Sequence, residues 1–448
     1  MPAMMRDARC LSALCALVTL VFAAPSSVQA QAQPYFGPDR QAIYAKLRRE
    51  INAITIFDNH GHPGLPDDGE VDATQIPADS SLPFRLRMDN AEFVAASRAL
   101  FGYTYNDFAP QHAASLVLEK KNLREKLGAA YFSRVLDEVG IETAIANRVS
   151  MPPYLQGARF RWVFFVDPFL FPLNNEGFAA KNPDLKLNVP LEEKLLQRYF
   201  SEASLKQVPS SFSDYLAFIS RILQQKKQAG GVGIKFEIAY FRSLFFADPA
   251  RDKAEKIYSQ YARGGSPPEG DYRDLQDFIF RYILQEAGRL QLPVQIHTAV
   301  GGGDYFNLSD GNIMKLESVL RDPRFGNVTF VLLHGGFPRE REAIWLAARK
   351  NVYLDSSLME LFLYPEEFKR SLQQWLETFP EKIVFGSDTF PISDVTGAEE
   401  FYWLAAESSR NALAAALAEM VSENEITELQ AAAFAHKYLH DTAVQLYK

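Results

Sequence analysis

Short apolar runs recur along the chain, and each is followed by polar residues and then by a segment with helical spacing. Eight such runs span residues 51–57, 141–146, 162–166, 233–238, 293–296, 328–333, 352–354 and 382–385. Uninterrupted apolar stretches of this length are typical of strands buried on both faces of a parallel sheet. Residues 339–350 and 366–379 carry apolar positions at helical spacing. Eight strand–helix repeats predict an α/β fold, and favour a closed (β/α)8 TIM-type barrel over an open sheet.

Two connections are longer than ordinary barrel loops. Residues 63–140 follow the first strand and residues 169–230 follow the third, and both carry mostly helical patterns. We therefore expect helical insertions at the catalytic mouth of the barrel, where loops shape the substrate pocket. Residues 251–271 are polar and contain Gly and Pro pairs, which predicts an exposed loop. Ser422 and Glu425 have the spacing of a capping box, which predicts the start of the last helix there.

The first 30 residues have the layout of a secretory signal peptide. A short basic start precedes an apolar run at residues 11–24, and Ala30 ends a stretch with the small or apolar positions that a signal peptidase reads. We expect cleavage after Ala30, export to the periplasm, and a single domain over residues 31–448. The alternative, an N-terminal membrane anchor, is disfavoured because the apolar run is short for a membrane span.

Composition narrows the chemistry. Both cysteines, Cys10 and Cys15, lie in the predicted signal peptide, so the mature protein would have no disulfide and no thiolate ligand. Without residues 1–30 the chain carries 45 basic and 54 acidic residues, a net charge of −9, and no run of Lys or Arg that could follow a nucleic-acid backbone. We expect a small-molecule substrate and neither a nucleic acid nor a membrane as partner. The sequence leaves open whether the protein forms a homo-oligomer.

Four of the seven histidines stand at the carboxyl ends of predicted strands. His60 and His62 end the first strand, and alternation along a strand points both side chains into the barrel mouth. His297 and His334 end the fifth and sixth strands, and Asp388 follows the eighth, which closes the barrel beside the first. A single histidine in such a place is more often a core or loop residue, but four at matching strand ends favour a metal site. Imidazoles and a carboxylate suit Zn²⁺ or a similar divalent ion.

The pattern resembles that of the amidohydrolase superfamily. The resemblance rests, in chain order, on His60-Gly61-His62, Lys235, His297, His334 and Asp388. The flanking segments PVQIHT, VLLHGG, NVYLDSS and KIVFGSD resemble the amidohydrolase-related branch, which includes decarboxylases and lactone hydrolases. The segment GIKFEIAYFRSL also resembles the fourth strand of nodulin- and FluG-like amidohydrolases. The resemblance is strongest at residues 51–62 and 230–390, and the two insertions carry little of it.

The resemblance implies a ligand set and roles for the remaining residues. His60, His62, His297 and Asp388 are implied as metal ligands. The sixth-strand His334 polarises substrate or orients water in one-metal relatives and is a ligand in two-metal relatives, in which the lysine at position 235 is carboxylated and bridges both ions. We favour one ion, with two expected only if Lys235 is carboxylated.

The reaction implied is hydrolysis of a C–N or C–O bond in a small molecule, of amide, lactone, ester or imine type, by a metal-activated water. Asp388 would accept the proton of that water and return it to the leaving group. His334 or the ion would stabilise the developing oxyanion. The alternative is metal-dependent nonoxidative decarboxylation of an aromatic or unsaturated acid, which would use the same ligands. A barrel that had lost its metal would lack ligand residues, and none is missing here.

Four further residues are weaker candidates. Tyr240 and Arg242 follow the fourth strand and could bind an acidic substrate, although a surface salt bridge explains them equally well. Asp58 could hydrogen-bond a ligand histidine from behind. Asp355 ends the seventh strand, where it could support the site or cap a helix.

Overall fold

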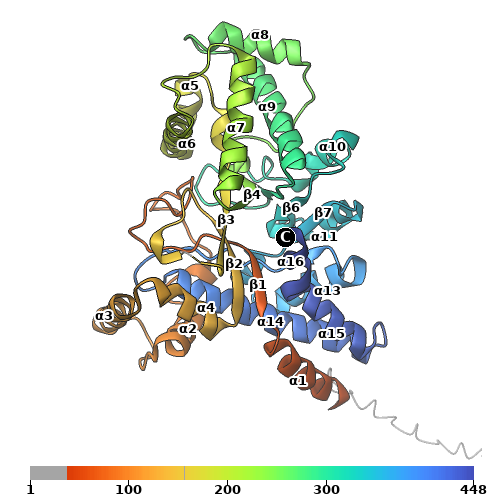
Figure 1. Ribbon diagram of the computed structural model, residues 1–448. Coiled ribbons are helices and arrows are strands. Elements are labelled where there is room, and N and C mark those ends of the chain that lie inside the picture. The colour runs from red at the N-terminus through yellow and green to blue at the C-terminus, as the bar shows by residue number, and fades with distance from the viewer. Residues whose placement is uncertain (1–37, 156) are drawn as a thin grey trace, which may run out of the picture.

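The computed structural model describes residues 38–155 and 157–448, and an eight-stranded parallel barrel forms its centre (Figure 1). The strands are β1 (Ile56–Gly61), β2 (Ile141–Asn147), β3 (Phe160–Phe165), β4 (Gly231–Phe236), β5 (Val294–His297), β6 (Phe330–Leu333), β7 (Val352–Asp355) and β8 (Ile383–Val384). Each strand pairs with the next in chain order. Backbone hydrogen bonds from Asn59 N to Phe385 O (3.0 Å) and from Asp388 N to His60 O (2.9 Å) bring the end of β8 against β1. The predicted (β/α)8 barrel is confirmed.

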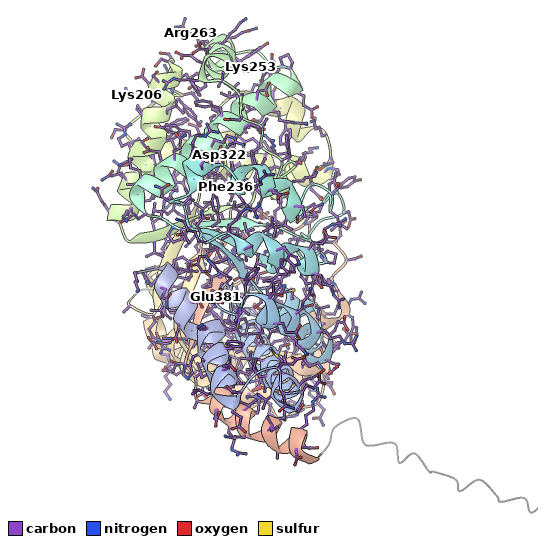
Figure 2. The ribbon with its side chains drawn as sticks, turned by 90° about the vertical axis from the view of Figure 1, so that its right-hand side faces the viewer. Lys206, Phe236, Lys253, Arg263, Asp322 and Glu381 are labelled. Atoms are coloured by element: carbon purple, nitrogen blue, oxygen red, sulfur yellow. The ribbon has the colours of Figure 1, made fainter. Side chains whose placement is uncertain are left out.

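Helices surround this barrel. They are α1 (Pro38–Asn52), α2 (Ala91–Phe101), α3 (Pro110–Leu127), α4 (Tyr131–Val139), α5 (Glu176–Ala179), α6 (Pro183–Glu202), α7 (Phe212–Gln228), α8 (Arg251–Tyr261), α9 (Glu269–Leu290), α10 (Glu317–Leu320), α11 (Glu340–Ala343), α12 (Met359–Phe362), α13 (Pro365–Thr378), α14 (Ala398–Ser422), α15 (Glu428–His436) and α16 (Thr442–Leu446). Helices α2 and α3 follow β1, and α5 to α7 follow β3, which confirms helical insertions at both places. Figure 2 shows Lys253 of α8 and Arg263 at the end of the molecule away from Glu381.

The barrel is filled by two kinds of side chain. Alternate strand residues such as Ile234 and Phe236 pack outward against the helices, and a separate apolar cluster that includes Phe57 and Val331 fills the interior. Tyr447, which follows α16, belongs to that inner cluster, so the C-terminal segment covers the floor of the barrel. None of the described helices is both long and apolar enough to cross a membrane.

Several predicted boundaries differ from the structure. The first predicted strand began at Ile51, but Ile51 and Asn52 end α1, and the strand starts at Ile56. The single helix predicted over residues 339–350 is the short α11 followed by a 3₁₀ helix at Ile344–Ala348. The predicted signal peptide, with both cysteines, lies outside the described residues.

Two local predictions are wrong. Residues 251–261 of the predicted loop form α8, because Ala254, Ile257 and Tyr258 place an apolar face at helical spacing against the neighbouring helices. The last helices do not begin at Ser422, which is instead the final residue of the 25-residue α14. The capping box that operates lies five residues later, with Thr427 as the cap of α15.

Candidate metal centre and active site

Two strands bring three candidate ligands together at the carboxyl end of the barrel. Asp388 Oδ1 lies 3.0 Å from His60 Nε2 and 3.8 Å from His62 Nε2. One ligand atom from each of these three buried residues lies within 4.8 Å of those of the other two. Strand alternation puts both histidines of β1 on one face, and closure of the barrel puts the β8 end beside them.

The electrostatics of these residues fit a divalent cation. Neither ring nitrogen of His60 makes a well-formed hydrogen bond with a described residue. Burial, together with the nearby charge of Lys235, holds the pKa of His60 and of His62 well below the usual value, so both imidazoles are neutral. Neutral imidazole is the form that ligates a metal, and one carboxylate beside such nitrogens completes a donor set that suits Zn²⁺ or a similar ion.

The other two histidines form a hydrogen-bonded pair at the edge of this group. His297 Nε2 lies 3.0 Å from the Val300 carbonyl oxygen, which can only accept, so Nε2 carries the proton. His297 Nδ1 lies 3.0 Å from His334 Nε2. His334 Nδ1 lies 2.9 Å from Ser357 Oγ and 3.9 Å from Asp388 Oδ2. The structure therefore brings His334 next to Asp388, whereas the lone pair of His297 is directed at His334, and its role as a ligand stays a prediction.

The backbone at this mouth is held in sparsely populated conformations. His334 has φ 62° and Asp388 has φ 44°, both in the left-handed region that non-glycine residues seldom occupy. Each such residue costs on the order of 1 kcal/mol and persists only where its surroundings impose it. Because His334 and Asp388 are both candidate catalytic residues, the strain lies where it positions catalytic side chains.

Asp58 holds the ends of β1 and β8 together. Its carboxyl group accepts hydrogen bonds from Ser387 N (2.7 Å), Ser387 Oγ (2.6 Å) and His60 N (3.2 Å). Burial raises the pKa of Asp58 to about 8, although these bonds oppose the shift. The expectation that Asp58 bonds a ligand imidazole is wrong in detail, because it fixes the backbone that carries the imidazole.

Asp355 plays a similar part beneath the histidine pair. It accepts from Asn59 Nδ2 (2.7 Å), Ser357 N (2.8 Å) and His334 N (3.4 Å), and burial raises its pKa to about 6. It therefore supports the position of His334, in agreement with the first of the two roles considered for it.

Lys235 is fully buried, and it lies beside a group of carboxylates that sequence reasoning largely missed. Its Nζ is 3.3 Å from Glu237 Oε1. Asp72 Oδ2 lies 3.1 Å from His62 Nδ1, so one ligand atom each from His62, Asp72 and Glu237 also falls within 4.8 Å of the others. No pattern in the sequence gave Glu237 a role in the site, and none singled out Asp72, which comes from the first insertion.

Two further carboxylates continue this group into the protein. Asp167 Oδ2 accepts from Glu237 N at 2.8 Å, and Glu192 of α6 is fully buried. Burial raises the pKa of Glu192 well above its usual value, and the charges of Asp167, Glu237 and Asp72 add to the shift. We call Asp72, Asp167, Glu192 and Glu237 the acidic cluster.

A cavity of about 980 Å³ lies over the candidate centre. The four histidines, Lys235, Glu237 and Asp388 line its polar floor. Its walls are largely apolar and come from the first insertion and from the loops after β5, β7 and β8, with Ile76, Leu82, Phe306, Leu358, Phe362 and Phe390 among them. A concave site with an apolar wall and a few convergent polar groups is typical of a small-molecule site.

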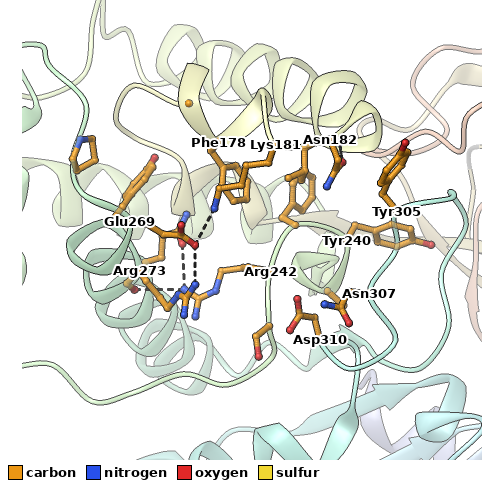
Figure 3. Close-up of a pocket in the computed structure, with 18 of the residues that line it drawn as sticks. Phe178, Lys181, Asn182, Tyr240, Arg242, Glu269, Arg273, Tyr305, Asn307 and Asp310 are labelled. Carbon is orange, nitrogen blue, oxygen red and sulfur yellow. Dashed lines mark hydrogen bonds and ion pairs between the residues drawn. The ribbon is translucent and has the colours of Figure 1, made fainter.

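Figure 3 shows a second cavity, of about 690 Å³, which shares the lining residue Tyr240 with the first. Tyr240 borders both cavities, and its ring centre lies 4.7 Å from that of His297. Arg242 lines only the second cavity, where it pairs with the buried Asp277 at 2.7 Å. The salt-bridge interpretation of Arg242 therefore holds, although the pair is buried rather than exposed, and binding of an acidic substrate stays a prediction.

Comparison with known proteins relates the C-terminal part of the chain to amidohydrolases. Residues 245–448 match the family model described as amidohydrolase. A 232-residue stretch, 48% of the chain, is 29% identical to Protein fluG of Emericella nidulans and spans 25% of that protein's length.

Solved structures resemble the chain over nearly its whole length. A protein of Lactobacillus casei described as a metal-dependent hydrolase is 18% identical with a TM-score of 0.57, covering 90% of this chain and 97% of that one. A uronate isomerase of Thermotoga maritima is 12% identical with a TM-score of 0.59, covering 91% and 97%. At such identities these structures establish the barrel fold alone.

Proposed function

We propose that the chain, whose residues 245–448 match the amidohydrolase family model, is a metal-dependent hydrolase of that family that cleaves a C–N or C–O bond of a small molecule. The observation that carries the proposal is the convergence of His60, His62 and Asp388 on one point at the floor of the 980 Å³ cavity. A bound substrate would place its scissile bond directly over these three side chains.

We propose Zn²⁺ as the ion and one ion per chain, because two neutral imidazoles and a carboxylate form a donor set that suits zinc. A divalent ion held there would supply Lewis-acid polarisation and make water available as a nucleophile near neutral pH. His297 would complete the set through Nδ1, its unprotonated nitrogen. Carboxylation of Lys235 would add a second ion, which metal analysis can count.

Asp388 and His334 have different roles in the proposed reaction. Asp388 Oδ1 faces the two imidazoles, which leaves Oδ2 to accept a proton from the attacking water and return it to the leaving nitrogen or oxygen. If His297 Nδ1 turns to the ion, His334 Nε2 loses its present neighbour, and in the tautomer protonated at Nε2 it presents an N–H to the substrate. That N–H can donate to the substrate oxygen on which negative charge develops.

The charge of the cavity favours hydrolysis over reactions of carboxylic acids. Its described lining contains five carboxylates, Asp68, Asp72, Glu237, Asp304 and Asp388, and a single Lys or Arg, Lys235. That lysine already lies beside Glu237. The carboxylate of an acid substrate for decarboxylation, or of a uronate such as the neighbouring isomerases are named for, would lack a cationic side chain to bind it.

The experiment is a hydrolysis screen with chelation and two variants. The protein loaded with Zn²⁺ is tested against amides, esters and lactones, then stripped with a chelator and reloaded. We expect activity to be lost on chelation and restored by the ion. Asp388→Asn should keep most of the metal and lose turnover by about a hundredfold or more, whereas Asp304→Asn, at an exposed carboxylate of the same cavity, should behave like the wild type.

Two results would contradict this function. Turnover of Asp388→Asn at the wild-type rate would remove Asp388 from the proton transfers. Release of CO₂ from aromatic or unsaturated acids, with no hydrolysis of any ester or amide, would select the decarboxylase instead.

The predicted signal peptide leads us to propose that this hydrolysis takes place in the periplasm. Sequencing the N-terminus of the protein from a fractionated Gram-negative host tests this, with a periplasmic product that begins at Gln31 as the expected result. An uncleaved chain in the cytoplasmic fraction would contradict it.

A further inference from the structure

The acidic cluster beside the candidate metal centre has a charge imbalance that the proposed ion does not resolve. Its four carboxylates, Asp72, Asp167, Glu192 and Glu237, face one lysine, Lys235. Asp167 and Glu192 are fully buried, and Asp72 and Glu237 line the cavity. Burying like charges at short range is strongly unfavourable unless a cation joins them or the carboxyl groups take up protons, and the pKa values of Asp72, Asp167 and Glu192 are accordingly raised.

Unpartnered buried atoms give independent evidence that a group is missing from this cluster. Both carboxylate oxygens of Glu192, and Oδ1 of Asp167, are buried without a hydrogen-bond partner among the described residues. Buried polar atoms are nearly always paired in native proteins. Glu237 is oriented toward the cavity side of the cluster, since its Oε2 accepts from Thr74 Oγ1 at 3.2 Å.

Two cations would suit the cluster, a second metal ion or a charged group of the substrate. The orientation of the two ring nitrogens of His62 favours the substrate group. His62 turns Nε2 toward Asp388 and Nδ1 toward Asp72, at 3.8 Å and 3.1 Å. A neutral imidazole carries a proton on one nitrogen and a lone pair on the other, so it cannot ligate two ions at once. With Nε2 directed at the metal centre, Nδ1 faces the Asp72 carboxylate, the side from which a carboxylate can orient a metal-binding histidine.

We propose that Asp72 and Glu237 form a subsite for a protonated nitrogen of the substrate, an ammonium, amidinium or guanidinium group held next to the bond that is cleaved. The inference rests on the proposed function and names its substrate class. Asp72 touches His62 directly, so the charged nitrogen lies adjacent to the reacting bond. Asp167 and Glu192 lie behind this pair, and a cation bound in front of them would favour their ionised forms.

The rest of the substrate is apolar in this proposal. Above the subsite the cavity wall carries Ile76, Leu358 and Phe390, and it offers no further Lys or Arg among the described lining residues. A substrate with an apolar or aromatic body and one cationic nitrogen matches both halves of the cavity. The second cavity differs in this respect, since Lys181, Arg242 and Arg273 all line it (Figure 3).

Three isosteric probes test the charge preference. Benzamidine, benzamide and benzoate have nearly the same shape and are cationic, neutral and anionic at neutral pH. Their binding to the zinc-loaded protein is measured by calorimetry, which needs no turnover. We expect benzamidine to bind at least about tenfold more tightly than benzamide, because charge-assisted hydrogen bonds replace neutral ones.

Charge-removing variants assign that preference to residues. Asp72→Asn and Glu237→Gln keep a hydrogen-bond acceptor for His62 and Thr74, and each should weaken benzamidine binding about tenfold while changing benzamide binding less than about twofold. Asp304→Asn, the exposed carboxylate of the same cavity, is the matched control and should change neither.

Two outcomes would overturn the subsite. One is equal affinity for benzamidine and benzamide, or benzamidine binding that survives both variants. The other is a second equivalent of metal in the wild type that disappears in Glu237→Gln, which would assign the cluster to an ion. If benzamidine binds as expected but no ester, amide or lactone is hydrolysed, the subsite stands and the proposed hydrolysis fails. If only neutral substrates are hydrolysed, the proposed hydrolysis stands and the subsite fails.

Discussion

Removing the hydroxyl of Tyr447 tests whether the C-terminal segment supports β1, the strand that positions His60 and His62. Tyr447 is 1% exposed, donates to Asn59 Oδ1 at 2.7 Å and accepts from Gln295 Nε2 at 2.7 Å. Tyr447→Phe keeps the ring, which stacks on Phe57 with 6.2 Å between centres. The change therefore removes two buried hydrogen bonds and almost no volume.

The expected loss follows from the groups left behind. Asn59 Oδ1 loses its donor and one N–H of Gln295 loses its acceptor, while Asn59 Nδ2 still donates to Asp355 and Gln295 still donates to Asn59 O. A buried polar group without a partner costs about 1–3 kcal/mol, so we expect the free energy of unfolding to fall by about 2–6 kcal/mol for the two groups together.

The assay is equilibrium unfolding in urea, followed by tryptophan fluorescence on the metal-free protein. Tyr364→Phe is the matched control, because Tyr364 is 47% exposed, and it should change the unfolding free energy by less than about 0.5 kcal/mol. A Tyr447→Phe protein as stable as the control would refute the view that this hydroxyl supports β1 from the barrel floor.

Two further changes test the packing and the buried charges. Gly335 has φ +53° and a Cβ there would overlap the indole of Trp375, whereas Gly102 has φ +68° and open space, so Gly335→Ala should cost about 3 kcal/mol or more and Gly102→Ala only about 1 kcal/mol in urea unfolding. Equal losses would mean that the indole moves aside freely. Burial raises the pKa of Glu400 from 4.5 to about 7, although Lys120 lies 2.9 Å away. Because the folded-state pKa is the higher one, the stabilising contribution is complete below about pH 4.5 and is lost as pH rises to about 7. The wild type should therefore lose about 3 kcal/mol over that range relative to Glu400→Gln, and parallel stability profiles of the two proteins would contradict the shift.

The fold and the centre of the site follow from the sequence for a simple geometric reason. Parallel strands of a closed barrel all end at one mouth, so residues such as His60, His62 and Asp388 must converge once the strands are identified. What strand order cannot give is the direction of each ring. His297 stands where the pattern puts it, but its lone pair is directed at His334, which depends on the Val300 carbonyl.

Asp167 and Glu237 follow strands β3 and β4, but the acidic cluster escaped prediction because its other two members have no common local pattern. Asp72 lies in a long loop and Glu192 on a helix of the second insertion, and either would be read as a solvated residue without the three-dimensional structure. Their proximity arises from how the two insertions fold over the mouth of the barrel, and no spacing in the sequence encodes that contact.

The missed helix α8 and the misplaced start of α15 have local causes. Only three apolar residues of α8 are buried, in a segment that is otherwise charged, so its composition resembles that of a loop until α7 and α9 are present. Ser422 with Glu425 and Thr427 with Gln430 both satisfy the capping-box pattern. The alanine-rich α14 continues through Ser422, which leaves the second pair as the functioning cap.

The metal content of site variants tests the central claim most directly. Four variants are compared with the wild type: His60→Ala, His62→Ala, Asp388→Ala and, as the control, His112→Ala in α3. Each protein is loaded with Zn²⁺, desalted and analysed by elemental mass spectrometry. Convergence of the three ligands predicts about one equivalent in the wild type and the His112 control, and a small fraction of that in the three site variants. Site variants that retain the metal content of the wild type would contradict the claim.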